Sequence, residues 1–544
     1  MLPAVQFDRV TTAAMCVAAL GLTAGYSWVC DDATISMRYA DNLAGGHGLV
    51  FNLGERVQGF TNPLWTLLLA IGAVFESNQR WAVGLGLLCT AGLLAVLAAI
   101  SRRLELGVWG IAFVLGATFL CDPFLQFQTS GLETSLVNLL VAATLLAALA
   151  TPRGSAPNLA IVLAALAMLT RLDSLLLTAP MLVAAHAIVG DRPRAALARA
   201  WRGYAIAGVL VLGWMSFAAL YYGYPLPNTY YAKTGAPRIG TIGLGLRYVA
   251  DFALLRAASA LVAAVGLAAT PRLWRSDIRG DRLLAGAGLG AGLAVLYVVW
   301  VGGDYMHGRF LCSPLLVLAI VAARALNSSP RLSGAAPRSR RWLLLAALLV
   351  TAAATSLAWR PTHGPTRVTN ERADWYGGPI PNFRVGVLPA LDLIDEPTLS
   401  HHLIGQRFGD DPRIVWIDGY GLVDPFVARC PIADAGRSGH FERRIPLAYM
   451  RARGDARLLA HGEARLLAGD PTLGPELARL RADPRWPSAE LERRYDELML
   501  LTRGPIFDPA RLRLIVKYTL SRQSIPDLEH AEVTRAGVDG EHPG

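Results

Sequence analysis

The sequence predicts a polytopic α-helical membrane protein of about eleven spans, followed by a C-terminal extracytoplasmic α/β domain. Three observations carry this prediction: the composition, the length of the apolar runs, and the way in which charge alternates between loops. Hydrophobic residues make up 53% of the 544 residues and charged residues only 17%, and the mean hydropathy is +0.38. Soluble domains carry about 25% charged residues, so the composition argues against a soluble enzyme and against a disordered chain.

Long apolar runs supply the spans. A membrane-spanning helix needs about 20 mostly apolar residues, and suitable stretches lie near 10–30, 82–100, 107–121, 134–150, 158–171, 175–190, 204–222, 250–270, 283–301, 309–326 and 342–359. One further apolar run, 64–75, is too short to span and leads into polar residues. We therefore predict a juxtamembrane helix over 64–80.

The loops between these stretches indicate sidedness. One set is rich in arginine, which is typical of cytoplasmic loops. The other set carries aromatic, glycine and acidic residues, and it comprises 31–63, 122–133, 171–174, 223–245 and 302–308. The alternation predicts a multi-pass protein of the inner (plasma) membrane with a cytoplasmic N-terminus. Residues 1–359 then form the transmembrane domain, and 360–544 form an extracytoplasmic domain whose tail from about 523 is flexible.

Other classes of protein find little support. The excess of 51 Lys and Arg over 41 Asp and Glu is explained by topology, and no nucleic-acid-binding motif is present. Cys430 is the one cysteine of six that lies in a polar region, so we expect no structural disulfide. No Cys or His spacing is typical of a zinc site.

Two adjacent carboxylates, Asp31 and Asp32, stand where the first apolar stretch ends. Charges at that depth cost several kcal/mol unless they are paired or hydrated. An ordinary helix cap is one alternative, since Asp often begins a helix. A pair followed by Arg38 on a short amphipathic helix favours a functional site. One carboxylate can then act as a general base while the other holds a metal ion or orients an acceptor hydroxyl.

Four sequence blocks carry a resemblance to a known family. The first is the segment 31–65, which contains Gly-His-Gly-Leu-Val-Phe-Asn (46–52) and Gly-Glu-Arg-Val (54–57). The others are Ser-Gly-Leu-Glu-Thr (130–134), Pro-Asn-Thr-Tyr-Tyr-Ala-Lys (227–233) and Gly-Gly-Asp-Tyr-Met-His-Gly-Arg-Phe (302–310). Their order and the layout of the spans resemble the GT-C superfamily of glycosyltransferases, which use polyprenyl-phosphate sugars. The blocks are similar to bacterial members grouped with mycobacterial arabinofuranosyltransferase B.

The resemblance implies a lipid phosphate as the leaving group, and cationic and hydroxyl side chains in the outer loops suit it. The candidates for binding donor phosphate or substrate are Arg38, His47, Tyr230, Tyr231, Lys233, Asp304, His307 and Arg309. Lys233 offers a compact ammonium for a point contact to phosphate. The plainer alternatives are snorkelling at the membrane interface for Lys233 and an ion pair with Asp304 for Arg309.

Weaker candidates would contact an acceptor. They are Glu133, which can equally favour the dipole of a helix beginning at 134, together with Asp418 and Tyr420. Capping a helix is the simpler role for Asp418, and core packing is the simpler role for Tyr420. Arg171 and Asp173 are predicted to form a buried ion pair rather than a site.

The implied activity is transfer of a sugar, with arabinofuranose as first choice, from a polyprenyl-phosphate donor to a cell-envelope polysaccharide or lipoglycan on the outer face. The lipid tail would lie between helices in the bilayer. Asp31 would act on the acceptor hydroxyl, and Asp32 would assist through an acceptor contact or a divalent cation (Mg, Mn or Ca). No other cofactor is expected. An Asp nucleophile is the alternative if configuration is retained. The alternative functions are a transporter or flippase for lipid-linked sugars, a transferase that uses a hexosyl lipid phosphate, and a scaffold protein with a degenerate site.

Overall fold

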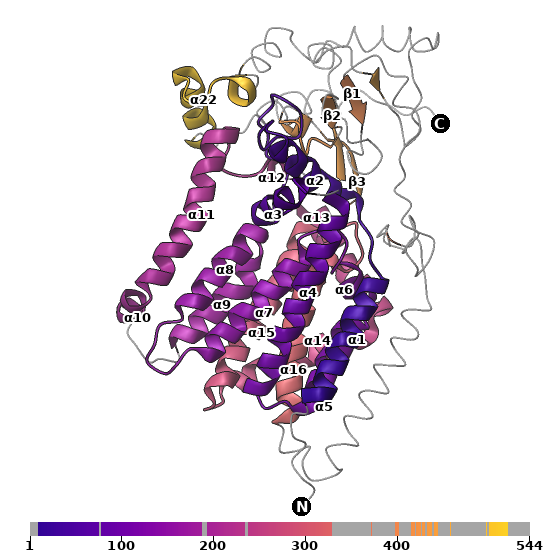
Figure 1. The fold of residues 1–544 in the computed structure, drawn as a ribbon, viewed down its shortest axis with the longest axis vertical. Coiled ribbons are helices and arrows are strands. Elements are labelled where there is room, and N and C mark those ends of the chain that lie inside the picture. Colours follow the sequence, from indigo (N-terminus) through magenta and orange to yellow (C-terminus); the bar gives the residue numbers. More distant parts are fainter. Residues whose placement is uncertain are drawn as a thin grey trace, which may run out of the picture. The chain divides into compact units, whose positions relative to one another are not determined.

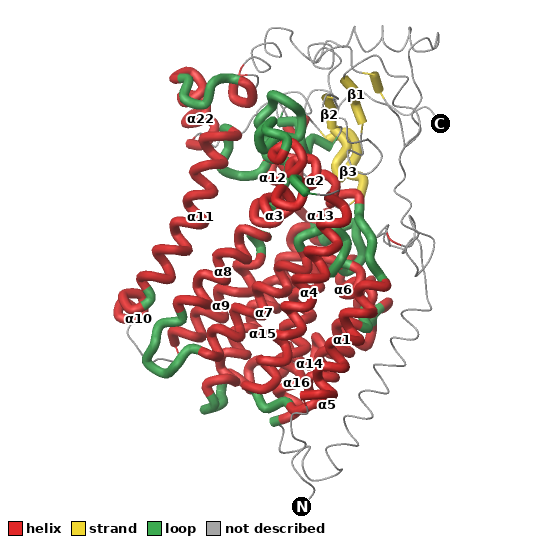
Figure 2. Tube along the Cα trace, in the orientation of Figure 1, coloured by secondary structure: helices red, strands yellow, loops and turns green. Residues whose placement is uncertain are grey.

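The computed structural model is helical over most of its described length (Figure 1, Figure 2). It describes residues 9–75, 78–187, 193–233, 238–328, 372, 398–401, 415–418, 420–425, 427–429, 432–437, 440–443, 457–458, 497 and 500–520. Contacts divide the chain into two compact units, which we describe separately. Unit 1 comprises residues 1–33, 62–211 and 237–384, and unit 2 comprises 34–61, 212–236 and 385–544.

Unit 1 is a helical bundle. Its helices are α1 (Arg9–Gly25), α3 (Pro63–Ala73), α4 (Asn78–Arg103), α5 (Gly107–Phe119), α6 (Asp122–Gln126), α7 (Thr134–Ala150), α8 (Asn158–Thr170), α9 (Ser174–Ala187), α10 (Pro193–Arg199), α13 (Arg238–Leu255), α14 (Ala257–Trp274), α15 (Arg279–Val301), the 3-10 turn η1 (Arg309–Leu311) and α16 (Cys312–Asn327). α15 packs closely along α9. Gly290 permits this approach, because an added Cβ would lie 2.5 Å from the carbonyl oxygen of Leu177.

Several helices have membrane-spanning length, as predicted for a multi-pass protein. Among the described residues, the helices long and apolar enough to cross a membrane are Asn78–Arg103, Trp201–Tyr222, Ala257–Trp274, Arg279–Val301 and Arg309–Asn327. Shorter apolar helices occupy most of the other predicted stretches. The predicted span 342–359 lies outside the described residues.

Two predicted boundaries are wrong. The stretch 250–270 is not one helix, because Arg256 adopts a non-helical conformation (φ −128°, ψ 45°) between α13 and α14. The predicted helix 64–80 is likewise divided. Pro63 begins α3, where a missing N–H costs nothing, and α3 ends at Ala73, while Asn78 already belongs to α4.

Unit 2 contains the strands. They form a parallel sheet in the order β2 (Val415–Asp418), β1 (Thr398–His401), β5 (Arg457–Leu458), and an antiparallel pair of β3 (Ile432–Arg437) and β4 (His440–Arg443). Thr398 is in register with Val415. The unit also holds α12 (Asn228–Lys233), the 3-10 turn η4 (Val427–Arg429) and α22 (Pro509–Leu520). The remainder of the predicted domain 360–544 lies outside the described residues, apart from Arg372, the segment 420–425 and a few residues near 500.

Two helices continue from one unit into the other, α2 (Asp31–Ala44) and α11 (Trp201–Tyr222). Within unit 2, Tyr39 of α2 is fully buried in an aromatic cluster with Phe51 and Phe60. Its hydroxyl donates to the carbonyl of Val57 (2.6 Å) and accepts from the amide of Gly59 (2.8 Å). The loop that follows α2 is therefore folded back onto that helix.

Candidate active site

The two predicted catalytic carboxylates form the first turn of α2. Asp31 and Asp32 are both partly exposed. The helix begins here because the preceding residue, Cys30, is buried and its amide donates to the carbonyl of Ser130 (2.9 Å). Carboxylates in a first turn also interact favourably with the positive end of the helix dipole. The carboxylates therefore stand at a fixed helix start inside unit 1.

Asp32 is engaged by two residues of the loop after α15. The hydroxyl of Tyr305 donates to Oδ1 (3.1 Å), and Nη1 of Arg309 lies 3.5 Å from Oδ2. Asp304 holds both partners, because its carboxylate accepts from Nε of Arg309 (2.6 Å) and from the amide of Tyr305 (2.9 Å). The structure thus brings together three of the predicted site residues, and it adds Tyr305, which the sequence reasoning missed. The predicted pairing of Arg309 with Asp304 is also present.

The conformation of this loop depends on glycine. Gly303 and Gly308 both have positive φ (75° and 66°), which other residues rarely adopt. An added Cβ at Gly303 would lie 2.6 Å from Tyr248, and one at Gly308 would lie 2.7 Å from Pro123. The hydroxyl of Tyr248 also donates to the carbonyl of Met306 (3.0 Å). The backbone around Tyr305 is therefore packed on both sides.

His307, a predicted substrate ligand, contacts a second ionic cluster. Its Nε2 lies 3.2 Å from Oδ2 of Asp122, and Asp122 accepts two hydrogen bonds from Arg256, one of them of 2.6 Å. Burial raises the pKa of the Asp122 carboxyl, but His307 and Arg256 outweigh this effect and hold that pKa below its ordinary value. The sequence reasoning missed Asp122 and Arg256. Asp122 was marked only as a charge at the edge of an apolar run, and Arg256 only as a charge inside the predicted stretch 250–270.

A third ionic group lies beside the first. Arg171 forms a two-pronged pair with Asp173 (2.8 and 3.0 Å), as predicted, and also reaches Oε1 of Glu133 (3.1 Å). The second oxygen of Glu133 accepts from the side chain of Asn62 (2.8 Å). The ring of Phe310 lies under Arg171 at 4.6 Å, within cation–π range. Glu133, the weak acceptor candidate, is therefore buried inside a network that ties α3 and α7 to the loop before α9.

The predicted donor ligands of α12 belong to unit 2. Asn228 anchors this helix, because its buried side chain donates to the carbonyls of Gly421 (2.7 Å) and Leu422 (3.1 Å). Tyr230 and Lys233 are exposed on the same short helix, and Tyr231 is half-buried. These three side chains are thus presented on a firmly held element.

The other two phosphate candidates in unit 2 lie on α2 and in the loop after it. Arg38 donates to the carbonyl of Phe51 (2.9 Å) and lies over the ring of that residue. His47 is exposed in the glycine-rich loop. Arg38 therefore supports the loop, whereas His47 stands open to a ligand.

Asp418 anchors a turn in unit 2 and not the start of a helix, so the helix-capping role that the sequence favoured is wrong. Its buried carboxylate accepts from the backbone amides of Tyr420 (3.0 Å), Leu422 and Val423 (3.3 Å). Burial raises the pKa of this carboxyl to about 7, and the three amide hydrogen bonds oppose that rise. Tyr420 is partly buried beside it.

We expect the raised pKa of Asp418 to make stability depend on pH. Its ordinary pKa is 3.8 and its folded pKa about 7, so the folded state favours the protonated form. The stability that the folded state gains from protonated Asp418 is complete below pH 3.8 and is lost as the pH rises through about 7. The melting temperature of the detergent-solubilised chain should therefore fall from about pH 5 to pH 8, and less so in Asp418→Asn. Asp508→Asn is the control, since Asp508 also accepts backbone amides but is partly exposed. An unchanged pH slope in Asp418→Asn would contradict the expectation.

Within the described residues, the structure offers no preformed centre for a resident metal ion. Across the described ranges no group of three or more His, Cys, Asp or Glu side chains is arranged to hold a metal ion. Asp32, the candidate metal ligand, already engages Tyr305 and Arg309. No step proposed below runs through a metal.

Comparison with known proteins shows which sequences the chain is similar to. No family model matches the chain. It is 32% identical over 367 residues to a terminal β-(1→2)-arabinofuranosyltransferase of Corynebacterium glutamicum, covering 58% of this chain and 51% of the relative. It is 28% identical over 329 residues to the Mycobacterium tuberculosis protein of the same name, covering 54% and 51%. The chain resembles bacterial arabinofuranosyltransferases. This confirms the predicted resemblance, although the chain spans only about half the length of these relatives.

Two solved structures also match the chain. They are crystal structures of ArnT from Cupriavidus metallidurans, one bound to undecaprenyl phosphate and one in the apo state. Their TM-scores are 0.45 and 0.43 at 16% and 17% identity, and each match covers 66% of both chains.

Proposed function

We propose that the chain is a membrane glycosyltransferase of the GT-C type. It transfers a sugar, in the first instance arabinofuranose, from a polyprenyl-phosphate donor to a cell-envelope polysaccharide or lipoglycan on the outer face of the membrane. The observation that carries the proposal is the pair of carboxylates at the start of α2, with Asp32 engaged by Tyr305 and Arg309. The sequence similarity to two terminal arabinofuranosyltransferases supports the choice of sugar.

The surroundings of Asp32 suggest its role. Asp32 has both oxygens engaged, which suits a residue that orients the acceptor or the neighbouring carboxylate. Asp31 is the proposed general base that takes the proton from the acceptor hydroxyl as that oxygen attacks the anomeric carbon. The bond from the anomeric carbon to the phosphate oxygen breaks, and the lipid phosphate leaves. Because a phosphate is already a good leaving group, no strong general acid is needed.

Cationic side chains would stabilise the negative charge that develops on the lipid phosphate as it leaves. Arg309 and Arg171 are each paired with two carboxylates, so they offer little net positive charge. Lys233 and Tyr230 on α12 and His47 are exposed within unit 2, and phosphate binding by these side chains stays a prediction from the sequence. A divalent cation remains part of the proposal only as an ion that Asp32 would share with the substrate. Transfer assays with EDTA, followed by addition of Mg²⁺ or Mn²⁺, test this point.

A donor panel tests the proposed function. Purified chain is incubated with synthetic arabinofuranosyl, mannosyl and glucosyl lipid phosphates and an envelope glycan acceptor, and the glycan products are analysed. We expect arabinofuranosyl transfer to exceed hexosyl transfer by at least about tenfold, which is about 1.4 kcal/mol of discrimination. Preference for a hexosyl donor would overturn the choice of sugar. Movement of the lipid-linked sugar across vesicles without any transfer would favour the flippase alternative and overturn the proposal.

A further inference from the structure

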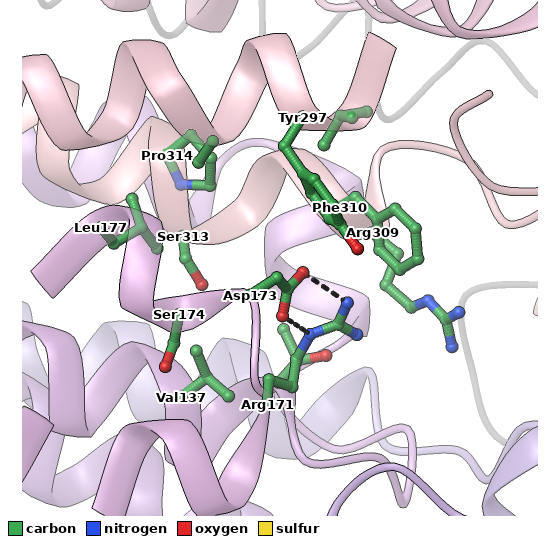
Figure 3. A pocket seen from close by; sticks show the side chains of 13 residues that line it. Val137, Arg171, Asp173, Ser174, Leu177, Tyr297, Arg309, Phe310, Ser313 and Pro314 are labelled. Carbon is green, nitrogen blue, oxygen red and sulfur yellow. Dashed lines mark hydrogen bonds and ion pairs between the residues drawn. The ribbon is translucent and has the colours of Figure 1, made fainter. Parts of the chain in front are cut away.

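Unit 1 contains a small polar cavity beside the ionic groups (Figure 3). It lies between the first turns of α7, α9 and α16 and the last turns of α15, and its volume is about 40 Å³. That is room for about three water molecules. Its polar lining includes Arg171, Asp173, Ser174, Tyr297 and Ser313. Figure 3 shows the two serines on one side of Asp173.

One hydroxyl in the lining of the cavity lacks a hydrogen-bond partner among the described residues. Ser174 is 2% exposed, and its hydroxyl has no hydrogen-bond partner within the part of the chain that the structure describes. Ser313 donates its hydrogen to Oδ1 of Asn138 (2.6 Å), which leaves its oxygen as an acceptor toward the cavity. Buried polar groups are nearly always hydrogen-bonded. These hydroxyls therefore indicate a polar occupant.

The charges around the cavity disfavour an anionic occupant. Arg171 is paired with Asp173 and Glu133, and Arg309 with Asp304 and Asp32. Four carboxylates thus surround two guanidinium groups, so a phosphate would meet no excess of positive charge. The atoms that remain available are the hydroxyl of Ser174, which can donate and accept, and the oxygen of Ser313; both carboxylate oxygens of Asp173 already accept from Arg171. They suit a group that both donates and accepts hydrogen bonds, as sugar hydroxyls do.

We propose that this cavity receives a hydroxymethyl group, or two neighbouring hydroxyls, of a neutral sugar. The cavity has room for such a group. Arg309 lines the cavity and also pairs with Asp32. The cavity therefore lies next to this catalytic carboxylate. The inference rests on the proposed function, since the sugar is one that reacts at Asp31 and Asp32. It belongs either to the donor or to the acceptor, and the hydroxyl pattern that fits the cavity sets the sugar specificity.

Removal of the cavity hydroxyls tests the proposal. Ser174→Ala, Ser313→Ala and the double variant are compared with Ser101→Ala. The control residue is a buried serine of α4 whose hydroxyl also lacks a partner among the described residues. Binding of methyl α-arabinofuranoside and methyl α-mannopyranoside to the full detergent-solubilised chain is measured by saturation-transfer NMR. We expect the double variant to bind the arabinofuranoside at least about tenfold more weakly, and Ser101→Ala to bind it like the unmodified chain. Equal binding by the double variant and the control would overturn the proposal.

Kinetics then distinguish the source of the sugar. A raised KM for the lipid-phosphate donor at unchanged kcat in the double variant assigns the cavity to the donor sugar, and a raised KM for the glycan assigns it to the acceptor. If no donor supports transfer but glycoside binding still depends on the two serines, the proposed function is wrong and the proposal that the cavity binds a sugar is supported. If transfer occurs and neither binding nor KM changes in the double variant, the cavity proposal alone fails.

Discussion

Asp31→Asn is expected to lower kcat for sugar transfer by about 10³-fold, the usual size of a general-base contribution. The substitution keeps the shape of the side chain but removes the group that takes the acceptor proton. Asp32→Asn is expected to lower kcat at least about tenfold. The reason is that the ion pair with Arg309 is lost while Tyr305 still has an oxygen to bind. Both values are measured as initial rates with the preferred lipid-phosphate donor at saturating concentration.

Asp41→Asn is a matched control for both variants. Asp41 lies on the same helix, α2, but is exposed and outside the first turn, so its loss should leave kcat unchanged. Melting temperatures of the three variants should agree closely with that of the unmodified chain, since a rate loss that accompanies unfolding says nothing about chemistry. Full activity in both Asp31→Asn and Asp32→Asn would remove the proposed catalytic site. A large loss of kcat in Asp32→Asn with no loss in Asp31→Asn would indicate that Asp32, and not Asp31, is the general base.

Local composition determined what the sequence could predict. Apolar runs such as 82–100 form helices because such a stretch must satisfy its own backbone polar groups in a membrane, and α4 covers that run. Arg309 and Asp304 lie close enough in the sequence for their pairing to be foreseen. The start of α2 at the carboxylate pair also followed from residue type, because Asp favours the first turn of a helix.

Contacts between distant segments determined what the sequence could not predict. Arg256 divides a predicted span, and its partner Asp122 is 134 residues away in the chain. Tyr305 had no charge to mark it, yet the fold places its hydroxyl on Asp32. Ser174 and Ser313 had no feature in the sequence to mark them, and their common cavity arises only when α9 and α16 pack in one bundle. A linear pattern contains none of these pairings.

The pairing of Asp122 with Arg256 gives the second large expected effect. Both side chains are buried, with 6% and 3% of their surface exposed. Asp122→Ala would leave the guanidinium of Arg256 buried without its partner, and such a change typically costs about 3–5 kcal/mol. We therefore expect a clear fall in the melting temperature of the detergent-solubilised chain. We also expect kcat to fall, because His307 loses its contact with Asp122 and the loop that carries Tyr305 and Arg309 loses one of its supports.

A double variant separates the charge from the packing at this position. Asp122→Ala/Arg256→Met removes both charges, so the uncompensated guanidinium disappears and much of the lost stability should return. Asp277→Ala is the matched control, because its pair with Arg282 is 3.5 Å long and largely exposed, and such pairs contribute about 0–1 kcal/mol. If the double variant melts as low as Asp122→Ala, the loss comes from packing and not from the buried charge. If kcat returns together with stability, the ion pair acts by holding the bundle together. If stability returns while kcat stays low, Asp122 positions the loop through His307.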